Sequence, residues 1–225
     1  MARREEITTI SKYITKILRH EAANVGLFID EQGWVDLDQL IAHMRSIPSL
    51  DGFLVQAVLA CNMDGTISES DVMNAVPHST KEVIFSIVED DEKGRFELST
   101  LKTMIRATQG HSITVNPDLS LISSEEGASM NAIHGTMARN IRKINTSGGL
   151  SKMRRTHIHM IDTPPEQGKV KSGYRPSCDR LIWINVPEAM HQGIKFYRSK
   201  NGVILSPGNS DGKIPCDCFL KITEV

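Results

Sequence analysis

The sequence predicts an α+β protein with two lobes, and three observations support this class. The first half reads as helices followed by a small hairpin, which is the pattern of a winged-helix module. The second half reads as a series of short strands with a few brief helices. The two patterns meet at Arg106–Ser112, so we expect one lobe over residues 1–112 and another over residues 113–225.

The first helix is predicted over residues 7–20, where apolar residues recur at helical spacing. It closes with Arg19 and His20, and cations at this end of a helix interact favourably with its dipole. A short extended piece follows, and Asp36 is placed to cap a second helix over residues 37–44.

Residues 46–79 read as a helical insertion without a catalytic role. An apolar helical stretch over residues 54–61 leads into a loop from Asn62 that looks like the start of a calcium-binding loop. Such a loop needs oxygen ligands through twelve positions and ends on a bidentate Glu, whereas Met73 stands at that position. The pattern therefore predicts no calcium site.

A helix over residues 80–89 and an acidic turn at 90–94 precede two short strands, at 95–98 and 102–105. Helices followed by such a hairpin favour a winged-helix module. Modules of this kind often bind nucleic acid, although a fold alone does not establish function.

The second half is predicted from alternation, turn residues and glycines. We expect a strand at 113–115, a linker end at 125–129, a strand at 131–136, a helix at 139–145 and a glycine-rich stop at 147–151. After these we expect a strand at 156–161, a buried central strand at 181–186, a short helix at 187–191, two hairpin strands at 195–199 and 203–206, and a last strand at 219–222. The glycines match neither a dinucleotide-binding fingerprint nor a P-loop, so those nucleotide-binding classes are excluded.

The bulk composition is that of a soluble globular protein, with 40% hydrophobic and 24% charged residues. The net charge of −1 provides no general attraction to nucleic acid, so any such binding needs a local patch. The four cysteines are too few and too irregular for a disulfide framework, and no apolar run is long enough for a membrane helix. We expect an intracellular protein with reduced thiols and no membrane association.

Three separate segments pair arginine with histidine: Leu18–His20, Arg106–Ser112 and Arg155–His159. Arginine offers a forked, permanently charged set of donors to phosphate or carboxylate, so the three segments together predict a site for an anion. Each segment taken alone also fits a polar turn or a helix cap. His157 and His159 share one face of a strand and could hold zinc, but no third ligand with suitable spacing follows, so we expect no metal.

In these and other motifs, the chain resembles the NAD-dependent RNA 2′-phosphotransferases. These enzymes remove the splice-junction 2′-phosphate from tRNA. The matching pieces, in the family's order, are Leu-Arg-His at 18–20, Gly-Trp-Val at 33–35, Lys-Gly-Arg-Phe-Glu-Leu at 93–98, Ile-Arg-Ala-Thr-Gln-Gly-His-Ser at 105–112, His-Gly-Thr at 134–136, Gly-Leu-Ser at 149–151, Arg-Thr-His-Ile-His at 155–159, Gly-Tyr-Arg at 173–175 and the run 193–208. Each piece is weak alone, and the set is specific.

The resemblance implies a winged-helix RNA-binding lobe joined to an ADP-ribosyltransferase-like NAD-binding lobe. It implies NAD as co-substrate, no metal, and an RNA partner with an internal 2′-phosphate, tRNA being the expected one; we expect a monomer. The implied reaction starts with attack of the RNA 2′-phosphate on C1″ of the NAD ribose, which expels nicotinamide. The neighbouring ribose hydroxyl then attacks that phosphorus and releases 2′-hydroxyl RNA and ADP-ribose 1″,2″-cyclic phosphate.

The resemblance also implies the site residues. The catalytic set is Arg19, His20, Arg106 and Arg155. The NAD-binding set is His134, Gly135, Thr136, Gly149, Ser151, Ser199 and Asn201, although the last two also read as ordinary polar residues at strand ends. Because arginine does not accept protons at ordinary pH, we expect the three arginines to bind the phosphate and His20 to handle the proton.

Two features depart from the family pattern: the insertion over residues 46–79 and the stretch Cys216–Cys218, for which we expect no catalytic consequence. Val203 stands where many ADP-ribosyltransferases carry a glutamate. An RNA phosphate arrives already ionised and needs no such carboxylate base. Two other functions stay open: an ADP-ribosyltransferase that modifies nucleic-acid phosphate ends, and a non-catalytic winged-helix nucleic-acid-binding protein, which the near-neutral charge disfavours.

Overall fold

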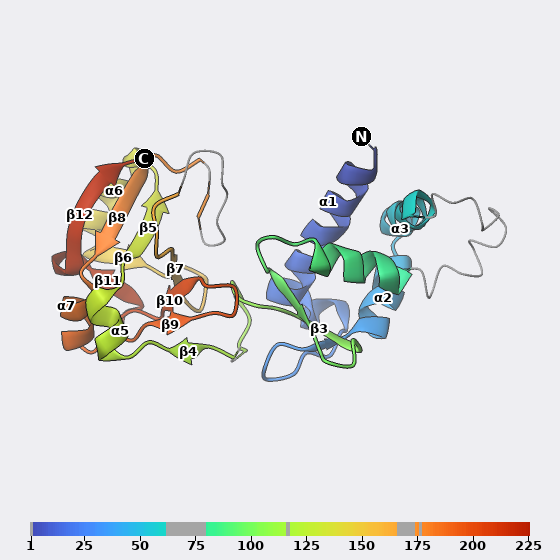
Figure 1. The fold of residues 1–225 in the computed structure, drawn as a ribbon, viewed down its shortest axis with the longest axis horizontal. Coiled ribbons are helices and arrows are strands. Elements are labelled where there is room, and N and C mark those ends of the chain that lie inside the picture. The colour runs from blue at the N-terminus through green and yellow to red at the C-terminus, as the bar shows by residue number, and fades with distance from the viewer. Residues whose placement is uncertain (1, 62–79, 116–117, 166–173, 176) are drawn as a thin grey trace. The chain divides into compact units, whose positions relative to one another are not determined.

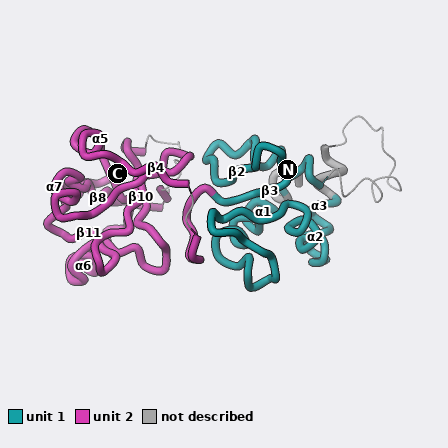
Figure 2. Tube along the Cα trace, turned by 90° about the horizontal axis from the view of Figure 1, so that it is seen from below, with its two compact units in different colours: residues 1–107 teal, residues 108–225 magenta. Residues whose placement is uncertain are grey.

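A computed structural model describes residues 2–61, 80–115, 118–165, 174–175 and 177–225. The chain divides into two compact units, residues 1–107 and residues 108–225 (Figures 1 and 2). Each unit mixes helices with short strands, which agrees with the predicted α+β class. None of the helices in the described ranges is long and apolar enough to cross a membrane.

The first unit begins with α1 (Ala2–Lys16), which continues directly into a π-helical turn, η1 (Ile17–Glu21). A 3₁₀ turn, η2 (Ala23–Val25), follows and ends at Gly26, whose φ of 78° places it in the left-handed region. Glycine adopts this conformation without steric cost, so the helical turns end here, six residues beyond the predicted end at residue 20.

Two more helices follow the strand β1 (Val35–Asp36): α2 (Leu37–Arg45) and α3 (Pro48–Cys61). The Asp36 carboxylate accepts a hydrogen bond from the Gln39 backbone N–H at 2.9 Å, which confirms the predicted N-cap. Residues 80–89 are helical, as predicted. The calcium-like loop lies outside the described residues.

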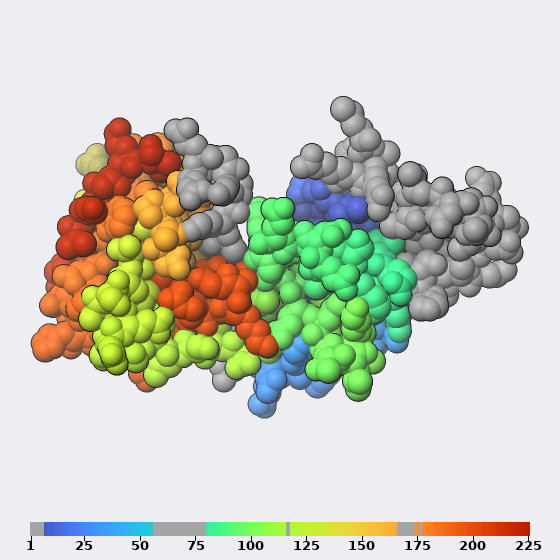
Figure 3. All heavy atoms as spheres, viewed as in Figure 1, coloured from blue at the N-terminus to red at the C-terminus, as the bar shows by residue number. Residues whose placement is uncertain are grey.

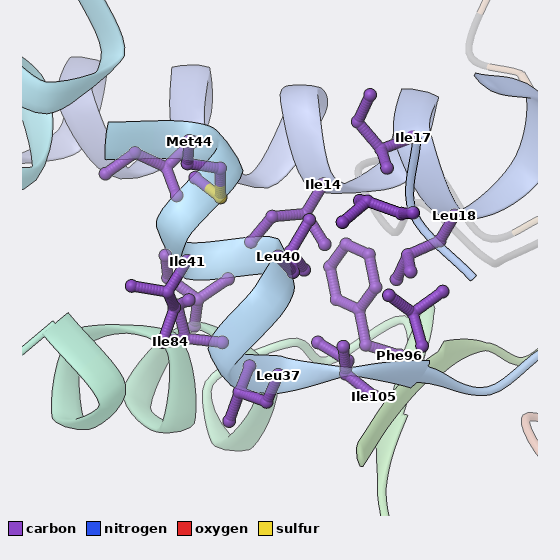
Figure 4. Close-up of a cluster of buried hydrophobic side chains, with 14 of the residues drawn as sticks. Ile14, Ile17, Leu18, Leu37, Leu40, Ile41, Met44, Ile84, Phe96 and Ile105 are labelled. Atoms are coloured by element: carbon purple, nitrogen blue, oxygen red, sulfur yellow. The ribbon is translucent and has the colours of Figure 1, made fainter. Parts of the chain in front are cut away.

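The unit-1 sheet contains β1, β2 (Phe96–Leu98) and β3 (Met104–Ala107), all antiparallel in the order β1-β3-β2. Figure 4 shows buried side chains of the helices and of this sheet pointing toward one another. Leu50 and Leu54 of α3 are also buried, so the described part of the predicted insertion contributes to the core. Burying an aliphatic side chain of this size stabilises a fold by roughly 1.5–3 kcal/mol.

The second unit is built on three small sheets. The first holds β5 (Ala132–Thr136), β8 (Arg180–Ile184) and β12 (Phe219–Glu224), with β8 in the centre as the apolar run predicts. The second has the order β4-β9-β10-β7, and its strands are β4 (Ser120–Leu121), β7 (Ile158–Met160), β9 (Tyr197–Arg198) and β10 (Ile204–Ser206). The third pairs β6 (Gly149–Ser151) with β11 (Lys213–Pro215).

The helices of this unit are α5 (Ser124–Ser129), α6 (Ala138–Thr146), α7 (Val186–His191) and the 3₁₀ turn η3 (Cys216–Cys218). An ion pair of 2.8 Å between Arg198 and Glu126 joins the β9–β10 hairpin to α5. Figure 3 shows these two segments side by side, the hairpin in orange-red and α5 in yellow-green. A bridge between Ile133 and Ile161 links the first sheet to the second.

Three predictions about elements are wrong. Residues 113 and 114 form bends and residue 115 has no regular structure, because β-branched residues build a strand only where a neighbouring strand pairs with them. Residues 125–129 belong to α5 and not to a linker, since Ser123 caps the helix by accepting from the Glu126 backbone N–H at 3.1 Å. The glycine-rich stop after α6 includes β6, whose partner β11 was not predicted.

Cys178, Cys216 and Cys218 are free thiols, in agreement with the prediction for these three. Burial raises the pKa of the Cys218 thiol to about 11, so it stays protonated at ordinary pH.

Candidate active site

A cavity of about 580 Å³ opens in the second unit, where β5, α6, β6 and the segment before β7 meet. Its volume lies in the usual range for small-molecule and cofactor sites. Six residues proposed from the sequence line it, and they come from three separate stretches of chain: His134, Gly135, Thr136, Gly149, Ser151 and Arg155. The fold thus gathers most of the site residues predicted in this half.

His134 stands on β5 with its ring orientation fixed by the neighbouring strand. Its Nδ1–H donates to the backbone carbonyl of His159 at 2.8 Å, so Nε2 of the neutral ring is a hydrogen-bond acceptor. Burial lowers the pKa of His134, and the nearby positive charges of Arg155 and Arg175 lower it further. A neutral imidazole that accepts a hydrogen bond suits a ligand hydroxyl.

Gly135 leaves room for an aromatic ring against β5. A Cβ atom at this position would lie 2.6 Å from a ring carbon of Tyr174 and 3.2 Å from the sulfur of Cys178. The Tyr174 hydroxyl donates to the Cys178 backbone carbonyl at 3.1 Å, which holds the ring in place. Glycine is therefore needed here for close approach of a side chain.

Gly149 has a different structural reason to be glycine. Its φ is 152°, and a Cβ atom would lie 2.3 Å from the backbone oxygen of Ile214 on β11. The absence of a side chain lets β6 and β11 pair, and the residues of β6 line the cavity. Ser151, on the same strand, accepts a hydrogen bond from the Met153 backbone N–H at 3.1 Å.

The cavity is positively charged. Five cationic side chains are among the described residues that line it, and none of its described lining residues is Asp or Glu: Lys143, Lys152, Arg154, Arg155 and Arg175. Partial burial lowers the pKa of Arg155, and Arg175 lowers it further by charge repulsion. Like charges held together in this way favour an anionic ligand.

The described polar contact of the Arg155 side chain is with His159: Nη1 donates to Nδ1 at 3.4 Å. In the part of the chain that the structure describes, neither Arg155 nor Arg175 forms an ion pair with a carboxylate. The remaining N–H donors of Arg155 stay available for a phosphate.

In the first unit, Arg19 and His20 lie in the π-helical turn η1. A π-helical turn is rare and often occurs at functional sites, because it changes the direction of the side chains it carries. Arg19 is half-buried and His20 is exposed.

Arg106 of β3 is held firmly within the first unit. Its Nε and Nη2 lie 2.8 Å and 2.7 Å from the same carboxylate oxygen of Glu97, which faces it across the hairpin. The guanidinium stacks over the ring of Trp34 at 4.4 Å, and the residue is only 3% exposed. The orientation of this cation is therefore set by its neighbours.

Ser199 and Asn201 lie in the β9–β10 hairpin and are not among the described residues that line the cavity. The Ser199 hydroxyl donates to the side-chain oxygen of Asn201 at 2.7 Å and accepts from the Val203 backbone N–H at 3.1 Å. These contacts shape the hairpin turn, and a role in binding NAD stays a prediction.

The described residues contain no group of three or more His, Cys, Asp or Glu side chains that could hold a metal ion. His157 has its Nδ1 3.0 Å from the hydroxyl oxygen of Thr156. Nδ1 of His159 accepts from Arg155. Both histidines line the cavity.

The family model described as RNA 2′-phosphotransferase, Tpt1/KptA family, matches residues 4–208. The chain belongs to this family. The tRNA 2′-phosphotransferase 1 of Danio rerio is 35% identical, over 92% of this chain and 81% of that protein. The human tRNA 2′-phosphotransferase 1 is 34% identical, over 90% and 70%. A protein of Flavobacterium johnsoniae named "Probable RNA 2′-phosphotransferase" is 30% identical, over 88% and 90%.

Sequence reasoning missed several side chains that line the cavity of this 2′-phosphotransferase family member. Lys143, Lys152, Arg154 and Arg175 were assigned no role, although Arg175 ends one of the matching motifs. The signal that could have found them is charge: residues 138–155 contain six cations and no Asp or Glu. Such a segment in a near-neutral chain indicates a local anion-binding patch.

Proposed function

We propose that this protein transfers an internal 2′-phosphate of RNA, such as that of a spliced tRNA, to NAD. The products are 2′-hydroxyl RNA, ADP-ribose 1″,2″-cyclic phosphate and nicotinamide. The observation that supports this most directly is the cavity of the second unit, which combines a neutral His134 acceptor with five cationic side chains. Membership of the RNA 2′-phosphotransferase family supports the same reaction.

We further propose that residues 1–112 form a winged-helix RNA-binding lobe and residues 113–225 an ADP-ribosyltransferase-like NAD-binding lobe. In support, the first unit packs helices against the small antiparallel sheet β1-β3-β2. The second unit carries the cavity on short strands. The compact units divide between Ala107 and Thr108, close to the predicted boundary.

The residues of the cavity fit NAD. Nε2 of His134 can accept a hydrogen bond from a ribose hydroxyl, and the lining arginines and lysines suit the diphosphate. When bound, NAD supplies an electrophilic ribose carbon with nicotinamide as its leaving group.

The chemistry of each side chain in the catalytic set indicates its proposed role. Arg19, Arg106 and Arg155 bind the phosphate and stabilise the charge that shifts on it, which is usually the largest contribution to such a reaction. Glu97 and Trp34 hold Arg106 in one orientation, so that its interaction with the phosphate needs little rearrangement. His20 moves the proton of the ribose hydroxyl or of the departing RNA oxygen.

The experiment is to incubate the protein with NAD and an RNA that carries one internal 2′-phosphate. We expect loss of that phosphate only when NAD is present. His20→Ala and Arg155→Ala should each reduce turnover by about 100-fold or more, since proton transfer and charge stabilisation each contribute roughly that much. Arg45→Ala, which removes a half-buried arginine of α2 paired with Asp51, serves as the matched control and should turn over normally.

Retention of the 2′-phosphate under all conditions would contradict the proposal. A stable ADP-ribosylated RNA product would indicate an ADP-ribosyltransferase, and RNA binding without any turnover would indicate a non-catalytic binding protein.

A further inference from the structure

Helix α6 carries an unusual charge distribution. Its nine residues include Arg139, Arg142 and Lys143 and no acidic residue. Ile141 and Ile144 pack against the unit-2 core, whereas the three cations are exposed. We call these three cations the basic face of α6.

This arrangement is unfavourable for the helix itself. Arg139 lies in the first turn, where the helix dipole favours negative charge and disfavours a cation. Arg139 and Lys143 are four residues apart and so are like-charged neighbours on the helix surface. Within the described part of the chain no carboxylate pairs with any of the three. The Asp179 carboxylate caps the start of α6 by accepting from the Ala138 backbone N–H at 2.6 Å, and among the described contacts it does not pair with the three cations. Exposed cations that no carboxylate pairs are expected where a polyanion supplies the missing charge.

The basic face is continuous with the cavity. Lys143 also lines the cavity, where Lys152 and Arg154 extend the same positive charge toward Arg155. Arg139 and Arg142 are not among the described lining residues, so they present their charge outside the space that the dinucleotide would fill.

We propose that Arg139 and Arg142 bind backbone phosphates of the RNA whose 2′-phosphate reacts at the cavity. This inference rests on the proposed function and adds an RNA-docking surface on the second unit. It also explains how a chain with net charge −1 attracts a polyanion, because the attraction comes from a local patch.

The test uses the full chain without NAD, so that binding is measured apart from turnover. The dissociation constant for an RNA with an internal 2′-phosphate, and for the same RNA without it, is measured by fluorescence anisotropy at several salt concentrations. Arg139→Gln with Arg142→Gln should weaken binding of both RNAs on the order of ten-fold at low salt. It should also reduce the slope of log Kd against log salt by about 1.4 to 1.8, at roughly 0.7–0.9 for each of the two RNA phosphates that the variant no longer neutralises.

Two controls match this variant. Lys195→Gln with Lys221→Gln removes the same number of charges from exposed positions of the same unit and should bind RNA as the wild type does. Arg139→Lys with Arg142→Lys keeps the charges and should retain most of the affinity. Calorimetry with NAD should give the same affinity for the wild type and the Arg139→Gln, Arg142→Gln variant.

Unchanged RNA affinity and salt slope in the Arg139→Gln, Arg142→Gln variant would show that α6 is an ordinary solvated surface and would overturn the inference. A weaker affinity for NAD with unchanged affinity for RNA would assign the two arginines to the dinucleotide and would also overturn it. A wild-type protein that binds neither RNA would also overturn the inference. If RNA binding depends on Arg139 and Arg142 but the 2′-phosphate is not removed, the proposed function is contradicted and the docking surface is supported.

Discussion

At the scale of single residues, the candidate site depends on side chains whose state is set by one or two neighbours. The carbonyl of His159 makes His134 an acceptor, and Glu97 with Trp34 orients Arg106. In both cases the neighbour determines what the functional group can do.

One prediction at this scale concerns pH. Because burial lowers the pKa of His134 in the folded protein, the unfolded chain binds this proton first as the pH falls below about 6.5. The contribution of neutral His134 to the free energy of unfolding is therefore fully present above about pH 6.5. It is lost as the pH falls from there toward the pKa of His134 in the folded protein. His134→Gln should lessen the decrease in the free energy of unfolding between pH 7 and pH 5, measured by urea denaturation. An unchanged pH dependence in this variant would contradict the assignment.

Another prediction concerns the partner of Arg106. Glu97→Gln leaves a buried guanidinium without its counter-charge, so we expect the free energy of unfolding to fall by about 1–3 kcal/mol and turnover to fall with it. The matched control is Glu89→Gln, which breaks the pair with Lys102, in which the side chains are 64% and 50% exposed. An exposed pair contributes less than about 1 kcal/mol. Equal effects of the two substitutions in urea denaturation and activity assays would argue against a positioning role for Glu97.

At the scale of elements, short strands and turns place the cavity lining. β5 carries His134, Gly135 and Thr136 in succession, and β6, which pairs with β11, lines the same cavity. That pairing depends on Gly149, because any side chain there would meet the backbone of β11.

We therefore expect Gly149→Ala to lower the free energy of unfolding by roughly 2 kcal/mol or more, since it adds a steric clash to a backbone conformation that alanine disfavours. The neighbouring Gly148 has a φ of 82° and open space around it. Gly148→Ala should cost only about 1 kcal/mol, the penalty of the left-handed conformation. Thermal or urea denaturation of both variants measures the difference, and equal costs would contradict the role given to β6.

Most elements were predictable because their signals are local. Helical spacing predicted the first helix and the helix over residues 80–89, and the pattern of residues 139–145 predicted α6. The Asp36 cap predicted α2, and the apolar run predicted β8. β6 and β11 were not predictable, because neither strand has a local pattern and each is defined by the partner it pairs with. The same holds for the site: its motifs were readable, whereas the neighbours that orient His134 and Arg106 come from distant segments.

At the scale of the whole molecule, the proposed catalytic set is divided between the two units. Arg19, His20 and Arg106 belong to the first unit and Arg155 to the second. If one phosphate is bound by residues of both units, then these residues act as a group, and their effects on turnover are coupled.

A double-mutant cycle measures this coupling. Arg19→Ala combined with Arg155→Ala should reduce turnover little more than the worse single substitution does, which corresponds to a coupling free energy above about 1 kcal/mol. Arg19→Ala combined with Arg45→Ala should show no coupling, because Arg45 pairs with Asp51 instead. Independent effects of Arg19 and Arg155 would contradict a shared phosphate.

Motif order, periodicity and turn chemistry along the chain were enough to predict the family, the α+β class, most helices and strands, and the residue types of the candidate site. The folded protein was needed to show that His134 is an acceptor, that Arg106 is buried against Glu97 and Trp34, and that cations of α6 and of the segment before β7 line one cavity. The physical reason is that charge, burial and hydrogen bonding depend on which distant residues become neighbours, and folding alone brings them together.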